Sequence, residues 1–293
     1  MKRILLTTLT LLILVVSALP AFSFEPFVET EQGAIAILYH TYKNGASAND
    51  GATNFDFRNE GGQDIIFPFE RYAVGATIAG RHRAWFTYQP LELVTNVTFR
   101  ENVTVGAESD GSASQTFAAG TPMELTYSFP FYRFTYTYDV LGKHDNAVLG
   151  LGLVLQIRDA SVKFLALNTD SSTTPAEGLY VSQNVGLVPA LAIYSEYRFP
   201  FGLNLSADIA GSYASSSFFN GADFDFEGSI LDASLRMGYE MENGFELFGT
   251  ARFFGGSAKG LSGPDESWAV SSYNYTENYI AALTVSVGAS WSR

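Results

Sequence analysis

The C-terminal segment alternates apolar residues with small polar ones over a long stretch. Its apolar positions are Tyr279, Ala281, Leu283, Val285, Val287, Ala289 and Trp291. From residue 282 onward the intervening positions hold only Ala, Thr, Ser or Gly, so an extended chain has one apolar and one small, polar face. At about 3.3 Å per residue and a tilt of about 40°, the segment rises roughly 30 Å, with an aromatic residue at each end. This pattern predicts a membrane-spanning β-strand.

The same alternation recurs along the chain, and Asp, Glu and Arg repeatedly fall on the face opposite the apolar one. It predicts an all-β fold: a transmembrane antiparallel up-and-down β-barrel of about twelve strands, with ten or fourteen as alternatives. A single barrel domain would cover residues 24–293. We expect strands near 33–42, 65–79, 82–95, 115–128, 131–140, 147–157, 161–168, 185–198, 203–213, 226–239, 245–255 and 275–291.

The connections between these strands fall into two classes that alternate in order. Short turns are expected near 79–82, 129–131, 158–161, 199–202 and 240–244. Longer loops are expected near 43–63, 97–113, 141–146, 168–182, 214–223 and 256–273. In membrane barrels short turns face the periplasm and longer loops face outward, and an even strand count leaves both termini on the periplasmic side.

The first residues predict export. Met1-Lys2-Arg3 precedes an apolar or hydroxylic run from Ile4 to Leu19, and a small-x-small site follows before Phe24. This arrangement is typical of a cleaved secretory signal peptide over residues 1–23. No later stretch has the apolar length of a membrane-spanning helix. The absence of cysteine excludes disulfides, thiolate metal sites and a lipoprotein anchor.

Composition and charge further restrict the class of protein to which the chain can belong. The sequence has 17 Lys and Arg against 30 Asp and Glu; without Lys2 and Arg3, 15 basic residues remain and the net charge is −15. Nucleic acid is therefore excluded as a partner. The sequence also contains 24 Phe, 16 Tyr and 27 Gly with only 16% charged residues, a balance that suits strands facing lipid on one side.

Signal peptide, alternating strands, aromatic girdles and a C-terminal strand ending in an aromatic residue resemble bacterial outer-membrane β-barrel proteins over the whole mature chain. The resemblance implies an outer-membrane location, with membrane lipid, lipopolysaccharide and the barrel-assembly machinery as partners. Members of this superfamily usually end on an aromatic residue, whereas here Ser292 and Arg293 follow Trp291. The expected girdle aromatics are Tyr132, Tyr239, Phe245, Tyr279 and Trp291.

The face opposite the apolar one would build the lumen, and it carries charges of both signs. The predicted lumen-lining residues are Arg71, Arg83, Glu124, Arg133, Asp139, Arg158, Lys163, Glu196, Arg198, Asp208, Asp232, Arg236, Glu246 and Arg252. Opposed charges could set the selectivity of a narrow channel for a small solute. They could equally cross-link the interior and plug it, because a barrel of about twelve strands lies between filled small barrels and open porins.

Enzymatic chemistry has little support in the sequence. It lacks H-E-x-x-H, G-x-S-x-G, G-x-x-x-x-G-K and G-x-G-x-x-G, and we predict no catalytic residue, cofactor or metal site. Of the three histidines, His40 lies near the outer end of its strand, His82 in a short turn and His144 in a loop. Only His40 could serve a lipid or lipopolysaccharide hydrolase as a base, and a polar rim residue is the simpler interpretation.

The sequence therefore supports a small porin-like channel with a mixed-charge lumen and acidic outward loops as the leading hypothesis. The alternatives are a hydrolase acting on lipid or lipopolysaccharide and a non-transporting structural or surface-interaction barrel. A secreted β-sandwich is a further alternative, because buried sandwich faces alternate too.

Overall fold

The computed structural model describes residues 23–45, 47, 51–106, 114–142, 144, 146–167, 179–216, 226–261 and 275–293, except for the side chains at 158, 179–186 and 261. The segment 1–22, which makes up nearly all of the predicted signal peptide, lies outside the described residues. No helix in the described part is long and apolar enough to cross a bilayer.

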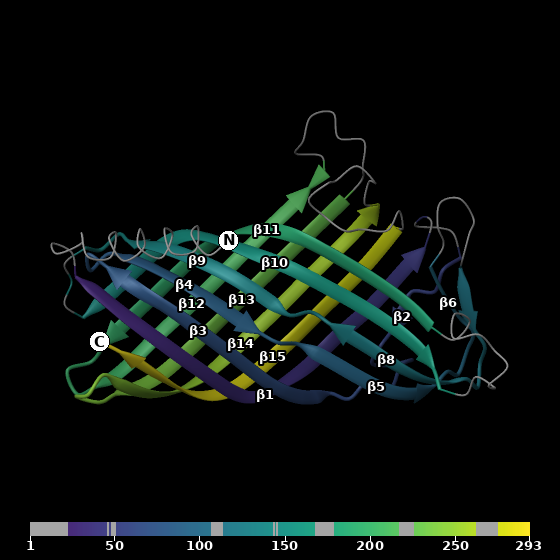
Figure 1. The fold of residues 1–293 in the computed structure, drawn as a ribbon, viewed down its shortest axis with the longest axis horizontal. Helices are drawn as coiled ribbons and strands as arrows, with labels where there is room; N and C mark the ends of the chain where they lie inside the picture. The colour runs from purple at the N-terminus through teal and green to yellow at the C-terminus, as the bar shows by residue number, and fades with distance from the viewer. Residues whose placement is uncertain are drawn as a thin grey trace, which may run out of the picture.

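The described elements are all β-strands (Figure 1). They are β1 (Phe24–Gly45), β2 (Phe55–Asp56), β3 (Ile66–Ile78), β4 (His82–Gln89), β5 (Glu92–Thr98), β6 (Val103–Val105), β7 (Gln115–Phe117), β8 (Pro122–Ser128), β9 (Phe131–Asp139), β10 (Ala147–Ala166), β11 (Leu179–Arg198), β12 (Leu203–Ser215), β13 (Phe226–Glu240), β14 (Phe245–Leu261) and β15 (Tyr275–Ser292).

Ten of these strands form a closed antiparallel ring in the order β1-β3-β4-β9-β10-β11-β12-β13-β14-β15. The ring closes where β15 pairs with β1 in register from Phe27↔Ser292 to Gly45↔Tyr275, with one irregularity between Ile37 and Tyr39. Strands β5 and β8 continue β4 and β9 beyond the ring, and β2 pairs with β1. The fold is therefore the predicted antiparallel barrel, with ten strands instead of about twelve.

The difference in strand number comes from two predicted turns where the chain continues straight. Residues 158–161 lie inside β10, which pairs with β11 without a register shift. Residues 129–131 join β8 to β9, and both strands pair with β10 in one continuous register, as Ser161↔Ser128 and Arg158↔Phe131 show. Pro130 has no N–H to donate to the ladder, so it interrupts the pairing without reversing the chain.

The two ends of the barrel differ. At one end, here called the terminal end, lie Phe24, Ser292 and the connections 79–81, 140–146, 199–202 and 241–244. At the opposite end, here called the loop end, lie the described strand ends that flank the segments 46–65, 99–121, 167–178, 216–225 and 262–274. Connection 140–146 thus lies at the end of the short turns, although a longer, outward loop was predicted near 141–146.

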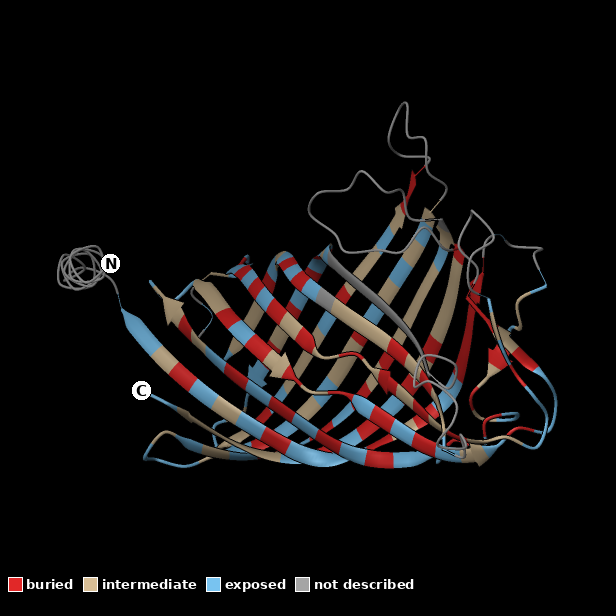
Figure 2. Cartoon of the chain, turned by 45° about the vertical axis from the view of Figure 1, so that its right-hand side comes forward, coloured by how far each residue is buried: buried red, intermediate tan, exposed pale blue. Residues whose placement is uncertain are grey.

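Burial alternates along the strands of the ring (Figure 2). The outward positions hold bare aliphatic side chains such as Leu153, Leu235 and Val287, which are 62%, 69% and 71% exposed. The inward positions of the same strands are buried or half-buried. This pattern fits a wall whose apolar face meets lipid, because contact between water and so many exposed aliphatic side chains would be unfavourable.

The polarity of the wall reverses towards the loop end. In β8, Met123, Leu125 and Tyr127 are buried in the interior, while Glu124 and Thr126 alternate with them on the other face. Strand β5 pairs only with β8, and β3 pairs with β4 only from Tyr72 to Ile78. The segment 51–65 fills the space beside β1, where its backbone bonds His40 and Ile37. This part of the wall has the polar outside and apolar inside of a water-soluble β-structure.

Candidate functional site

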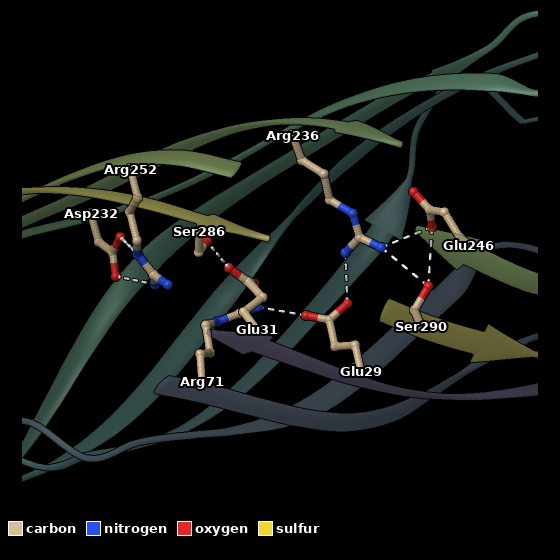
Figure 3. A network of polar contacts seen from close by, with 9 residues as sticks. All are labelled: Glu29, Glu31, Arg71, Asp232, Arg236, Glu246, Arg252, Ser286 and Ser290. Atoms are coloured by element: carbon tan, nitrogen blue, oxygen red, sulfur yellow. Dashed lines mark hydrogen bonds and ion pairs between the residues drawn. The ribbon is translucent and has the colours of Figure 1, made fainter. Parts of the chain in front are cut away.

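The lumen is the candidate site, because the inward faces of the strands concentrate the buried charged side chains of the described chain. Two clusters occupy it. The ion-pair layer consists of Glu29, Glu31, Arg71, Arg133, Asp232, Arg236, Glu246 and Arg252, all of which except Arg133 are drawn in Figure 3. The aromatic layer, nearer the loop end, consists of Phe55, Phe57, Phe99, Tyr127, Phe129, Phe131, Phe164 and Phe254 with the aliphatic residues around them.

Asp232 is the centre of one half of the ion-pair layer. Its Oδ1 accepts a hydrogen bond from Arg252 Nε at 2.6 Å, and its Oδ2 accepts one from Arg252 Nη2 at 2.7 Å. Arg133 Nη1 lies 2.7 Å from the same Oδ2, and Arg133 Nη2 also donates to Gln156 Oε1 at 2.8 Å. Because β9 and β13 lie on nearly opposite sides of the ring, the Arg133–Asp232 pair bridges the lumen.

The other half joins β1 to its neighbours and to β13. Arg71 Nη1 lies 2.5 Å from Glu29 Oε1 and 2.6 Å from Glu31 Oε1. Arg236 donates to Glu29 Oε2 and Glu246 Oε2, both at 2.8 Å, so Glu29 links two arginines. Of these bonds, visible in Figure 3, the one between Arg236 and Glu29 joins strands that are not adjacent in the ring, β13 and β1. Buried charges persist when they are paired and hydrogen-bonded in this way.

The aromatic layer closes the lumen one step nearer the loop end. Phe131 on β9 and Phe254 on β14 meet edge to face across the ring, with ring centroids 4.9 Å apart. Phe55 and Phe57, from the segment that follows β1, insert into the same core and both contact Phe164. Side chains of strands from opposite walls therefore touch directly at successive levels of the barrel.

His40 belongs to this core and not to the rim. Its ring is fully buried, stacks on Phe57 at 4.1 Å and meets the edge of Tyr127 at 4.4 Å. Its Nδ1 lies 3.2 Å from Gln63 Oε1. No substrate can reach a histidine enclosed in this way, so the arrangement argues against the role that the hydrolase hypothesis gave it. His82 lies on the surface beside Tyr136, and His144 lines a cavity at the terminal end.

The structure places most of the predicted lumen residues on the inward face. Those that join the internal ion pairs or line internal cavities are Arg71, Arg83, Arg133, Asp139, Glu196, Asp208, Asp232, Arg236, Glu246 and Arg252. Arg198 lies at the mouth of the terminal end, where it pairs with Glu196. The side chain of Arg158 lies outside the described part of the chain.

The prediction that Glu124 and Lys163 line the lumen was wrong. They pair with each other at 3.4 Å, each about one-third exposed, on the face opposite the aromatic layer. The prediction placed the polar face inward along the whole of each strand. Beyond the membrane-facing part of the wall that rule reverses, because the outside there meets water and the inside is the aromatic layer.

The girdle aromatics lie on the outward face in two groups. Tyr239, Phe245 and Trp291 lie near the terminal end, where Phe245 is directly opposite Trp291. Tyr132 and Tyr279 lie towards the loop end, and Tyr132 stacks on Tyr88 with centroids 5.2 Å apart.

Sequence reasoning missed Glu29 and Glu31. The first strand was expected at 33–42, whereas β1 starts at Phe24. Around these residues the outward positions are Val28, Thr30 and Gln32. They do not form the continuous apolar face that would predict a membrane-facing strand. Their carboxylates become recognisable as lumen groups only through their partners on β3 and β13.

Within the described residues no group of His, Cys, Asp and Glu is arranged to hold a metal ion. Asp50 and Asp223, acidic residues of the outward loops predicted near 43–63 and 214–223, lie outside the described residues.

No protein-family model matches the chain, and no curated protein matches its sequence. Among solved structures, the chain is similar to the outer membrane protease OmpT of Escherichia coli, with a TM-score of 0.51 and 9% identity over 92% of this chain and 98% of that chain. A Pseudomonas aeruginosa FadL homologue matches with a TM-score of 0.36 and 9% identity, covering 92% of this chain and 90% of the homologue. The Pseudomonas putida toluene transporter TodX matches with a TM-score of 0.32 and 12% identity over 90% and 89%. At these identities the likeness to OmpT shows the fold alone: the chain resembles outer-membrane β-barrels.

Proposed function

We propose that the protein is an outer-membrane barrel whose lumen is closed along its axis, and that it acts as a non-conducting scaffold which presents its loop end outside the cell. In this orientation the terminal end faces the periplasm, as the short connections there favour. The proposal prefers the surface-interaction alternative to the small channel.

One observation carries this proposal: opposite walls of the barrel are in direct side-chain contact. The Arg133–Asp232 pair at 2.7 Å and the Phe131–Phe254 contact at 4.9 Å both span the ring. A hydrated channel needs a continuous path between charged rings, whereas these contacts obstruct the lumen at two levels.

The form of the wall supports the proposal that the loop end is presented as a binding surface. Strands β5, β8 and the outer part of β10 extend beyond the outward tyrosines Tyr88 and Tyr132, with polar residues outside and an aromatic core inside. Such a core gives the loop end a rigid base, which is what a surface that binds a partner requires.

Conductance across planar lipid bilayers tests the closed lumen. The wild-type protein, shown to be folded by heat-modifiable gel migration, should insert without conductance steps. The double substitution Arg133→Ala with Phe254→Ala removes a contact at both levels and should produce steps, which also shows that the assay detects an open barrel. Glu124→Ala, on the outer face, is the matched control and should stay silent.

A wild-type conductance that changes with Arg236→Ala or Arg252→Ala would instead establish the small channel. Fractionation tests the location: the folded protein should be recovered from washed outer membranes, whereas recovery as a soluble protein would contradict the proposed membrane location.

A further inference from the structure

A cavity of about 160 Å³ opens at the terminal end, outside both layers that close the lumen. It lies between β1, β3, β4, β9, β10 and β11, and its lining includes Arg83, Thr137, Glu196 and Arg198. This volume holds several water molecules or one small molecule. Neither the closed lumen nor the scaffold role makes use of it.

The hollow depends on a glycine. Gly150 on β10 faces the cavity, and a Cβ at this position would lie 2.8 Å from Thr137 Oγ1 and 2.9 Å from Thr137 Cβ. Any side chain there would crowd the neighbouring strand and occupy the space. The backbone of β10 thus forms a flat wall next to the charged groups of β4 and β11.

Arg83 is a half-buried cation of this cavity, with 23% of its side chain exposed. Its guanidinium carbon lies 4.3 Å from the ring centroid of Phe27 and 4.5 Å from that of Tyr194, so two aromatic rings hold it in place. Its ion pair with Glu196 is long, at 3.9 Å, and its Nε has no partner within the described part of the chain. The guanidinium therefore keeps donors that point to no protein acceptor.

Glu196 does not neutralise both of its arginines. One of its oxygens accepts a hydrogen bond from Tyr194 Oη, and the other accepts one from Arg198 Nε. One carboxylate therefore stands between two guanidinium groups, Arg83 and Arg198. The wider lining of the cavity also holds Arg81, Glu25 and Asp139. The side chain of Arg198 is 55% exposed at the mouth, where an entering ligand would meet it first.

We propose that this cavity binds a small ligand through an oxyanion, a carboxylate or a phosphate group, held by Arg83 with Arg198 as the second cation. Guanidinium groups bind both oxyanions through paired N–H donors in a fixed fork, which suits a site whose cation is already oriented. In the proposed orientation such a ligand comes from the periplasm. This site is independent of whether the barrel conducts.

Tryptophan fluorescence provides the readout, because Arg83 lies 5.6 Å from the ring centroid of Trp85. The folded protein in detergent micelles is titrated separately with sodium phosphate and sodium acetate at constant ionic strength. We expect a saturable change with at least one anion, and the anion that gives it identifies the group recognised. Trp85→Phe should remove the signal.

Three variants separate binding from general effects of charge. Arg83→Gln should weaken binding about tenfold or more, since it removes charge-assisted hydrogen bonds. Glu196→Gln should tighten binding, because it removes the competing carboxylate; loss of a merely structural ion pair would not have this effect. Arg100→Gln, at the exposed loop end, is the control and should not change the curve.

Heat-modifiable migration shows whether each variant folds. If Arg83→Gln does not fold, Arg198→Gln at the exposed mouth replaces it and should weaken binding severalfold. The proposal is overturned if neither anion gives a saturable change, or if the folded arginine variants give the wild-type curve.

Discussion

Arg133 Nη1 lies 2.7 Å from Asp232 Oδ2, although their strands, β9 and β13, stand on nearly opposite sides of the ring. Asp232 also accepts hydrogen bonds from Nε and Nη2 of Arg252. A single carboxylate thus pairs with two buried guanidinium groups from two walls of the barrel.

Asp232→Ala should therefore be strongly destabilising. It leaves Arg133 and Arg252 buried without their shared partner, and breaking a buried pair in this way costs about 3–5 kcal/mol. Urea unfolding in lipid vesicles measures the change. Glu124→Ala removes an ion pair of the outer face and should cost no more than about 1 kcal/mol. Equal losses in the two variants would show that the ion-pair layer does not hold the walls together.

The position of the apolar band can be tested with two arginine substitutions. Leu235 lies on β13 midway between Leu231 and Tyr239 and is 69% exposed, so Leu235→Arg should cost about 2–4 kcal/mol in a bilayer. Val94, on the outward face of β5 between Glu92 and Asn96, lies beyond the band, and Val94→Arg should cost at most about 1 kcal/mol. The readout is equilibrium unfolding in vesicles, and a larger loss at position 94 would contradict the placement of the band.

The turn between β13 and β14 requires glycine for two reasons. Gly244 has a φ of 81°, and a Cβ there would lie 2.2 Å from the carbonyl oxygen of Ser292. Gly51 has a similar φ of 85° but no atom within 4 Å of the added Cβ. Gly51→Ala should cost about 1–2 kcal/mol for the backbone conformation alone. Gly244→Ala should cost a further 1–3 kcal/mol, roughly, for the displaced C-terminal strand. Indistinguishable urea midpoints would argue against the contact with Ser292.

Phe57→Ala should loosen the segment that lies beside β1. The ring of Phe57 stacks on His40, so its removal leaves a hole in the aromatic layer and weakens the hold on residues 51–65. Trypsin cleavage after Arg58 should then become faster in vesicle-inserted protein, as gel electrophoresis of timed digests would show. Ile66→Ala, at a side chain that is 66% exposed, should leave the cleavage rate unchanged. Equal cleavage of both variants would mean that the core does not anchor this segment.

Sequence reasoning predicted the barrel because lipid imposes the same alternation on every membrane-facing strand. The C-terminal strand, with Val285 and Val287 outward, follows that rule from Leu283 to Trp291. The strand number was wrong where local signals conflict with pairing: Pro130 indicates a turn, yet the register of β10 against β8 and β9 carries the chain straight past it. Only the partner strand contains that information.

The charged site was predicted in part for a similar reason. The alternation along a strand, which places charged residues on the face opposite the aliphatic ones, identifies Arg236 and Arg252 as inward-facing. It does not give their partners: Arg236 reaches Glu29 across 207 residues of sequence. It also fails for Glu124, where the solvent outside the wall changes from lipid to water and the meaning of the alternation reverses with it.

The closure between β1 and β15 has a consequence for how the molecule is made. Every other neighbouring pair in the ring is joined by a connection along the chain, whereas this one brings together the two ends of the described chain, Phe27 beside Ser292. Contacts between residues so distant in sequence form late, since the intervening chain must be confined first. Until then β1 and β15 are unprotected edges open to pairing with another chain. The bonds that Ser286 donates to Glu31 and that Arg236 donates to Glu29 join the two sides of this last seam, so this part of the interior polar network forms in the same step that removes the edges.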